Sequence, residues 1–171
     1  STLDDVQALN PDAMVVLTGG EPLLRNDLEE IVRHGSQLGL FLVLGTNGVQ
    51  LTQKRISMLK AAGLMGVGVS LDSIDAQKHD DFRGRHGCWQ KTIDGLGMCR
   101  EKDLSFQIHF TVNQRNYGEI DDIIALSEEL GARVVNIFFL ICTGRGETVS
   151  DITPQQYELA LRDIIKAQES Y

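Results

Sequence analysis

The chain has 171 residues, of which 42% are hydrophobic and 23% are charged, and its formal net charge is -8. A chain of this length can form one domain with a sizeable core, and the composition is that of a soluble globular protein. The acidic balance, without a basic cluster, excludes a nucleic-acid-binding surface. No apolar run approaches the ~20 residues that are needed to cross a bilayer.

Five short segments are predicted to be strands, and helical segments alternate with them. The strands are expected at 14–18, 41–45, 66–71, 105–112 and 134–140. The helices between them have recognisable ends. The expected N-caps are Asn26, Thr52, Asn116 and Thr153, and the glycines expected after helix ends are Gly63 and Gly131.

This alternation predicts the α/β class, with a parallel sheet and right-handed crossovers. In the third strand, Val67 and Val69 share one face, while Gly68 and Ser70 share the other. The fourth strand, 105–112, alternates in the same way. One face is apolar and the other is small or polar, so the pattern favours a barrel with a roomy, polar lumen over a densely filled one.

Each predicted strand ends in small, polar residues, and ligands of parallel α/β proteins gather at such ends. The most specific end is LTGGEPLLRND, residues 17–27. Gly19 and Gly20 permit backbone angles that are closed to other residues, and Pro22 restricts Glu21 to an extended conformation. These residues predict an aimed carboxylate at the barrel mouth. The alternative is an ordinary strand-to-helix turn with a solvated glutamate.

Five motifs follow one another from about residue 12 to about residue 147: VVLTGGEPLL, LGTNG, VSLDS, DDFRGRHGCW and TVN. The ordered set resembles the radical S-adenosylmethionine (SAM) superfamily, and within it the branch of molybdenum-cofactor, pyrroloquinoline-quinone and haem-biosynthesis enzymes. The resemblance implies a partial (β/α) barrel of six strands. It also implies a [4Fe–4S] cluster that receives an electron from an external donor. The reduced cluster cleaves SAM, which gives a radical able to abstract a substrate hydrogen.

In this family the GGEP loop holds the amino group of SAM, which assigns the ammonium to Glu21 with help from the backbone of Gly19 and Gly20. Arg83 is the candidate for the SAM carboxylate, the alternative being a surface arginine between helices. Asn113 is a candidate ribose or adenine contact, or else an asparagine that satisfies a strand end. The other residues that the resemblance assigns to SAM are Thr46, Asn47, Ser70, Asp72, Ile141 and Cys142.

Two residues are candidates for substrate contact. His109 is expected to point into the lumen, although a hydrogen-bonded interior histidine is the alternative. The segment FFLICTGRGE, 138–147, is similar to enzymes that edit haem side chains, so Arg145 could bind a carboxylate of a tetrapyrrole. A maturase acting on a peptide or protein is the first alternative. Outside the family, the alternatives are a non-catalytic α/β ligand-binding or interaction domain and a phosphate-binding barrel enzyme.

The chain departs from the family in lacking the cluster motif C-x-x-x-C-x-x-C. Cys88, Cys99 and Cys142 lie far apart and are expected to be buried or half-buried thiols in a reducing cytoplasm. Residues 1–171 are therefore interpreted as an internal fragment, with five βα units corresponding to strands two to six. We expect the fragment to bind no metal, to be inactive alone, and to self-associate through the edge of strand 14–18.

Overall fold

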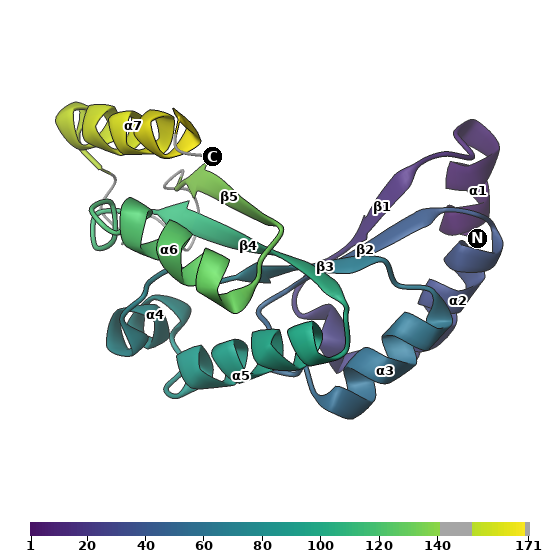
Figure 1. Cartoon of the computed structure of the whole chain (residues 1–171). Helices are drawn as coiled ribbons and strands as arrows, with labels where there is room; N and C mark the ends of the chain where they lie inside the picture. The colour runs from purple at the N-terminus through teal and green to yellow at the C-terminus, as the bar shows by residue number, and fades with distance from the viewer. Residues whose placement is uncertain (141–151, 170–171) are drawn as a thin grey trace.

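The computed structural model describes residues 1–140 and 152–169. Five parallel strands form one sheet in the order β1-β2-β3-β4-β5 (Figure 1). The strands are β1 (Met14–Leu17), β2 (Phe41–Thr46), β3 (Gly66–Ser70), β4 (Ser105–Val112) and β5 (Val134–Phe139). Each bound lies within one residue of its prediction, and the expected α/β class with a parallel sheet is confirmed.

The connections between strands are helical. The helices are α1 (Thr2–Leu9), α2 (Leu28–Gln37), α3 (Gln53–Ala62), α4 (Ala76–Arg83), α5 (Cys88–Glu101), α6 (Ile120–Leu130) and α7 (Pro154–Glu169), with a 3₁₀ turn, η1 (Pro22–Leu24). Helix α4 has a weak sequence signal because the residues it buries are His79 and Asp80 rather than an apolar stripe. Hydrophobic periodicity therefore gives little indication of this helix.

Two of the predicted helix caps are wrong. The N-cap of α2 is Asp27 rather than Asn26, and the N-cap of α6 is Glu119 rather than Asn116. The Asn116 amide instead donates to the backbone oxygens of Asp72, at 2.7 Å, and of Thr111. A buried amide must find partners, and here it joins the ends of two strands.

Other predicted helix ends are confirmed. The Thr52 hydroxyl accepts a hydrogen bond from the amide of Arg55, as a side-chain cap does. Gly63 and Gly131 follow their helices in the left-handed conformation, with φ of 105° and 89°. Thr153 accepts from the amide of Gln156 at the start of α7.

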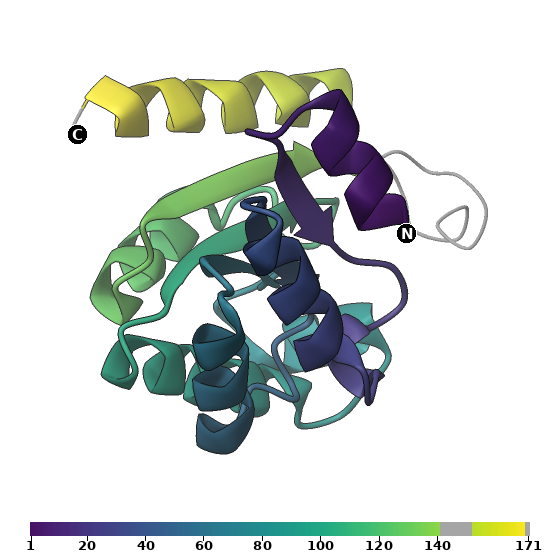
Figure 2. The same cartoon turned by 90° about the vertical axis from the view of Figure 1, so that its right-hand side faces the viewer.

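The hydrophobic core lies between the sheet and the helices α2, α3, α5 and α6, which gather on one side of the sheet (Figures 1 and 2). The sheet itself is twisted and curved, as in a partial barrel (Figure 2). Fully buried members of the core include Leu42, Leu44, Val69, Ile108 and Phe110 from strands, and Val32, Ile56, Leu59, Leu96 and Ile123 from helices. Burial of these side chains leaves the opposite face of the sheet available to line the lumen.

The lumen face is less polar than the sequence predicts. The expectation holds for β3 and β4, which carry Ser70 and His109 into a polar pocket. It is wrong for β1, β2 and β5, where Val16, Phe41 and Val134 are 51%, 46% and 48% exposed and line an apolar pocket of about 430 Å³. The prediction extended the pattern of β3 and β4 to the whole sheet, and the other three strands do not share it.

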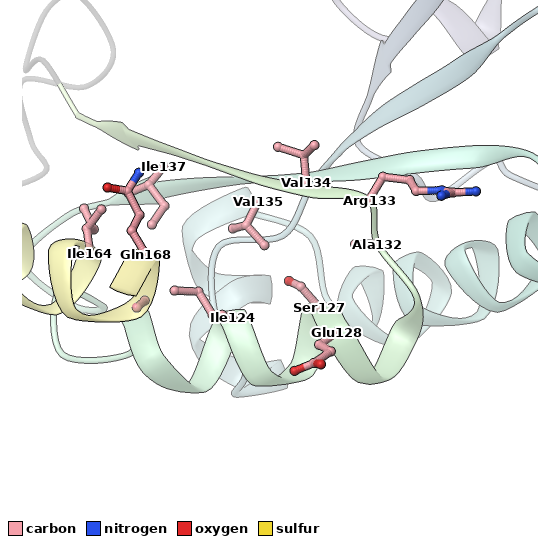
Figure 3. Close-up of a pocket in the computed structure, with 11 residues that line it drawn as sticks. Ile124, Ser127, Glu128, Ala132, Arg133, Val134, Val135, Ile137, Ile164 and Gln168 are labelled. Carbon is pink, nitrogen blue, oxygen red and sulfur yellow. The ribbon is translucent and has the colours of Figure 1, made fainter. Parts of the chain in front are cut away.

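Helix α7 packs beside α6 and β5. Tyr157 of α7 stacks on Phe139, with ring centroids 4.6 Å apart. Towards the amino end of β5 a cavity of about 440 Å³ remains between α6, β5 and α7, lined mainly by aliphatic side chains such as Ile124, Val135 and Ile164 (Figure 3). It belongs to the packing of α7 and is remote from the strand ends that carry the sequence motifs. In the described part of the chain, no helix is long and apolar enough to cross a membrane.

Candidate functional site

The carboxyl ends of β1 to β4 and the residues that follow them enclose a pocket of about 510 Å³. This volume lies in the range of roughly 300–1,000 Å³ that is typical of small-molecule sites. The predicted site residues that line it are Gly20, Glu21, Thr46, Asn47, Ser70, Arg83 and His109. Gly19, Asp72 and Asn113 do not line this pocket. Ile141, Cys142 and Arg145 lie outside the described residues.

Glu21 is held in one orientation by hydrogen-bond donors from two segments. Its Oε1 accepts from the Thr46 hydroxyl at 2.6 Å and from the Leu23 amide at 3.1 Å, and its Oε2 accepts from the Asn47 amide at 2.8 Å. An ionised carboxylate offers about four acceptor positions. One position on Oε2 therefore stays available to a ligand, and the carboxylate faces the pocket rather than bulk water.

The backbone of this loop has the conformation that its residues predict. Gly19 and Gly20 have φ of 104° and 54°, in the left-handed region that favours glycine. Glu21, before Pro22, is extended, with φ of -128° and ψ of 105°. The sequence is thus sufficient to predict how the chain leaves β1 and where its carboxylate points.

The loop after β2 is supported from behind by α5. The Thr92 hydroxyl of α5 donates to the backbone oxygen of Asn47 at 3.0 Å. Gly48 has φ of 80°, and a Cβ there would lie 2.8 Å from Val69 Cγ1 and 3.0 Å from Thr92 Cγ2. Because the loop is packed this closely, the Asn47 amide is fixed where it meets Glu21.

Asp72 and Arg83 form an ion pair at the pocket wall. The Arg83 Nε donates to Asp72 Oδ2 at 2.5 Å, and its Nη2 contacts the same oxygen. Asp72 is 2% exposed, and its Oδ1 also accepts from the Thr111 amide. Among the described residues, the Asp72 carboxylate forms no hydrogen bond with Ser70. Asp72 orients Arg83 instead.

Asn113 is turned towards its own loop. Its amide donates to the Thr111 oxygen at 3.2 Å, and its oxygen accepts from the Arg115 amide at 2.9 Å. The side chain is 2% exposed. This geometry favours the structural alternative for Asn113, and its contact with ribose or adenine stays a prediction.

His109 lies in the lumen, where the polar pocket meets the apolar one. The ring packs against Gly68: a Cβ at that glycine would be only 2.5 Å from His109 Cε1. Phe138 contacts the ring edge-on, with centroids 5.5 Å apart. No described residue forms a hydrogen bond with the imidazole, so its nitrogens are available to a bound molecule.

Two basic side chains that line the pocket were not predicted from the sequence. His79 of α4 is 1% exposed, and its Nδ1 accepts a hydrogen bond from the Asp72 amide at 3.1 Å. Arg85, just after α4, lines the pocket, and its side chain has no partner among the described residues. Arg85 belongs to the segment DDFRGRHGCW, in which only Arg83 was singled out, and His79 immediately precedes that segment.

The cysteines and acidic residues do not form a metal centre in the described part of the chain, where no group of three or more His, Cys, Asp or Glu side chains could hold an ion. Burial raises the pKa of Cys88 to about 11 and that of Cys99 to about 12, so both are protonated thiols at neutral pH. Hydrogen bonds from the amides of Trp89 and Gly87 lower the pKa of Asp80 to about 2. These groups are structural in this geometry.

Buried His79 and half-buried His109 predict that the fold is less stable in mild acid. Burial lowers the pKa of His79 and of His109 below the value of 6.5 expected in the unfolded chain. Around His79, the charges of Asp72 and Asp80 oppose this shift and that of Arg83 adds to it. As the pH falls through about 6.5, the unfolded state takes up protons first, so stability falls.

We expect a lower melting temperature at about pH 5.5 than at about pH 7.5, measured by circular dichroism at constant ionic strength. Replacing His109 with glutamine should reduce the difference. A melting temperature that does not change over this range would contradict the burial effect.

The fold and the site together define a class: a ligand-binding α/β half-barrel with an aimed carboxylate where its parallel strands end. Residues 3–127 match the Radical SAM superfamily. This match covers more than half of the chain, and the chain therefore belongs to the radical SAM superfamily.

Similar proteins support this assignment. An "AdoMet-dependent heme synthase" of Methanosarcina barkeri is 40% identical over 167 residues, which are 98% of this chain and 48% of the relative. A "PqqA peptide cyclase" of Rhizobium meliloti is 31% identical over 158 residues, which are 91% of this chain and 42% of the relative. The chain spans about half the length of the curated relatives it matches, and both relatives lie in the branch that the motifs indicate.

Among solved structures, Streptococcus suis SuiB bound to S-adenosylmethionine has a TM-score of 0.75 to this chain, at 15% identity. The likeness covers 91% of this chain and 37% of SuiB. At this identity it shows a shared fold, and it confirms the radical SAM type of partial barrel.

Proposed function

We propose that this chain is the SAM-binding portion of an enzyme that uses SAM and a [4Fe–4S] cluster to start radical modification of a tetrapyrrole or another cofactor precursor. The observation that carries the proposal is that charges of both signs line the pocket. Glu21, in the loop after β1, contributes a carboxylate, and Arg83 and Arg85, at and just after the end of α4, contribute cations. A zwitterionic amino-acid group, such as the methionine part of SAM, complements both kinds of charge.

The pocket residues fit SAM in chemical type. Glu21 would bind the ammonium through its available acceptor position, next to the backbone of Gly19 and Gly20. Arg83 would bind the carboxylate, because Asp72 occupies its Nε and Nη2 but no described residue accepts from Nη1. The polar residues left for the methionine and ribose portions are Thr46, Asn47 and Ser70, with Asn113, Ile141 and Cys142 as the predicted contacts of ribose and adenine. Bound SAM would supply the radical on reductive cleavage of its sulfonium.

The described residues do not fit a [4Fe–4S] cluster, because no three of their cysteines or other ligating side chains lie together. We therefore assign no residue and no step to the cluster. The interpretation of residues 1–171 as an internal fragment stays a prediction, as do the external electron donor, the inactivity of the fragment alone and the cytoplasmic location. Three cysteines at the family spacing in the upstream gene sequence would support the interpretation.

A tetrapyrrole is the substrate class that we favour. The haem synthase relative is 40% identical to this chain and the peptide cyclase 31%, and a peptide is therefore the second candidate. His109 would contact the substrate where the polar and apolar pockets meet, since its ring nitrogens have no hydrogen-bond partner among the described residues. Arg145 stays the predicted partner of a substrate carboxylate.

The test uses the complete protein, reconstituted anaerobically with its cluster and supplied with dithionite and SAM. We expect formation of 5′-deoxyadenosine, measured by liquid chromatography, to increase several-fold when an iron porphyrin with propionate side chains is added. A precursor peptide serves as the competing substrate. Stimulation by the peptide alone would support the maturase alternative, and absence of SAM binding would remove the proposal altogether.

We also propose that the chain, when produced as residues 1–171, self-associates through β1. This strand lies at one end of the sheet order, and Met14 and Val16 are 65% and 51% exposed. An unpaired edge with exposed apolar side chains is a template for pairing with another chain. Light scattering should show species larger than a monomer, and a monomeric, high-melting chain would contradict this.

A further inference from the structure

His79 is a buried histidine that reaches the pocket from α4. The residue is 1% exposed, yet it is among those that line the pocket with Glu21 and Arg83. A polar side chain that is buried to this degree is ordinarily satisfied by hydrogen bonds at both ends. The partners of its two ring nitrogens therefore decide what it does.

One nitrogen is fully accounted for. The amide of Asp72 donates to His79 Nδ1 at 3.1 Å, so Nδ1 carries no proton. A neutral imidazole with an unprotonated Nδ1 has its proton on Nε2. Burial also lowers the pKa of His79, which keeps the ring neutral at pH 7. The fold thus sets the tautomer of this ring through the backbone at the end of β3.

The other nitrogen has no partner. No described residue accepts a hydrogen bond from Nε2, and Nε2 is not among the fully enclosed side-chain atoms that lack a partner. It follows that the Nε2–H group has access to the pocket that His79 lines. The ring is therefore a donor with a fixed proton, and a bound molecule would be the acceptor.

The surroundings of His79 indicate which part of a ligand it would meet. Asp72 Oδ2 lies 4.0 Å from His79 Nδ1 and is paired with Arg83, so the histidine and the arginine are neighbours. The negative charge of Asp72 is taken up by this pairing. The groups left on this side are all donors: His79 Nε2, Arg83 Nη1 and the Arg85 guanidinium. Such a set is suited to an anionic acceptor.

We propose that His79 donates a hydrogen bond from Nε2–H to the carboxylate of the amino-acid part of SAM, beside Arg83. The inference rests on the proposed SAM-binding function. The competing explanation is purely structural: His79 would only accept the hydrogen bond of the Asp72 amide, just after β3. The two explanations differ in whether the effect of a substitution depends on the ligand carboxylate.

Two substitutions separate the functions of the two nitrogens. Asparagine at position 79 can accept from the Asp72 amide but does not extend to the position of Nε2, whereas glutamine places an N–H donor near that position. We expect His79→Asn to weaken SAM binding about tenfold, and His79→Gln to retain most of the affinity. His34→Asn, on the surface of α2, is the control and should bind SAM normally.

The affinities are measured by anaerobic titration calorimetry of the complete, reconstituted protein with SAM and with decarboxylated SAM. For the analogue, which lacks the carboxylate, wild type and His79→Asn should bind equally. Equal loss of affinity for both ligands, or no loss for either, would overturn the role of His79 while leaving SAM binding intact. Failure of the wild type to bind either ligand would remove the proposed function, and this inference with it.

A second measurement uses the wild-type protein, so it does not depend on whether a variant folds. In the wild-type protein labelled with ¹⁵N-histidine, the His79 Nε2 resonance should be that of a protonated nitrogen and should move when SAM is added. It should move less with decarboxylated SAM. An unprotonated Nε2, or identical shifts with the two ligands, would contradict the inference.

Discussion

Replacement of Glu21 by glutamine is expected to weaken SAM binding by roughly 10- to 100-fold, because a charge-assisted hydrogen bond to the ammonium is lost. The substitution also disturbs the hydrogen bonds that hold the side chain of residue 21 in place. The carboxylate accepts from Thr46, Leu23 and Asn47, whereas glutamine turns an NH₂ group towards one of these donors. Rotation of the side chain relieves neither effect, since hydrogen-bond donors face both carboxylate oxygens, Oε1 and Oε2.

The control for Glu21→Gln is Glu29→Gln. Glu29 is a buried carboxylate, 7% exposed, that pairs with Arg55 between α2 and α3 and does not line the pocket. Calorimetric titration of SAM into each complete, reconstituted protein should show the loss for Glu21→Gln and not for Glu29→Gln. Unchanged SAM affinity in Glu21→Gln would contradict the role of Glu21.

Replacement of Gly48 by alanine should destabilise the fold by about 2–5 kcal/mol, through two additive costs. The left-handed conformation costs an alanine roughly 1–2 kcal/mol, and overpacking adds roughly 1–3 kcal/mol. The backbone has φ of 80° there, and the new Cβ would lie 2.8 Å from Val69 Cγ1. For a domain of this size the melting temperature should fall by roughly 5–15 °C.

Gly39→Ala isolates the two costs. Gly39 has nearly the same φ, 82°, but a Cβ there meets nothing within 4 Å. Thermal unfolding followed by circular dichroism should show a loss of only about 1–2 kcal/mol for Gly39→Ala. Equal losses in the two variants would mean that the loop after β2 is not closely packed against β3 and α5.

The amino-acid sequence is sufficient where local chemistry decides the structure. Gly19, Gly20 and Pro22 restrict their own backbone and that of Glu21, and the observed angles are those that their residue types favour. The alternation of polar and apolar residues in the strands likewise placed Ser70 and His109 on the lumen face. Such predictions succeed because they depend on residues within a few positions of one another.

Contacts between distant segments could not be predicted in this way. Asn116 is read as a helix cap, but its amide is taken by Asp72, 44 positions away. Arg83 is read as a free cation, but it pairs with Asp72, 11 positions away. A periodic pattern shows which face of a strand or helix a residue occupies, but it does not identify the residue's hydrogen-bond partner. The orientation of a buried polar group depends on that partner.

The sequence by itself determined the parallel α/β order, the aimed carboxylate at the end of β1 and, through its motifs, the superfamily. Only the tertiary structure decided that Arg83 is oriented by Asp72, that His79 enters the pocket, and that β1, β2 and β5 make part of the lumen apolar. The physical reason is the range of the interactions involved. Backbone preferences and the alternation of polar and apolar residues depend on residues close together in the sequence. Hydrogen bonds and ion pairs between buried groups depend on how separate βα units pack.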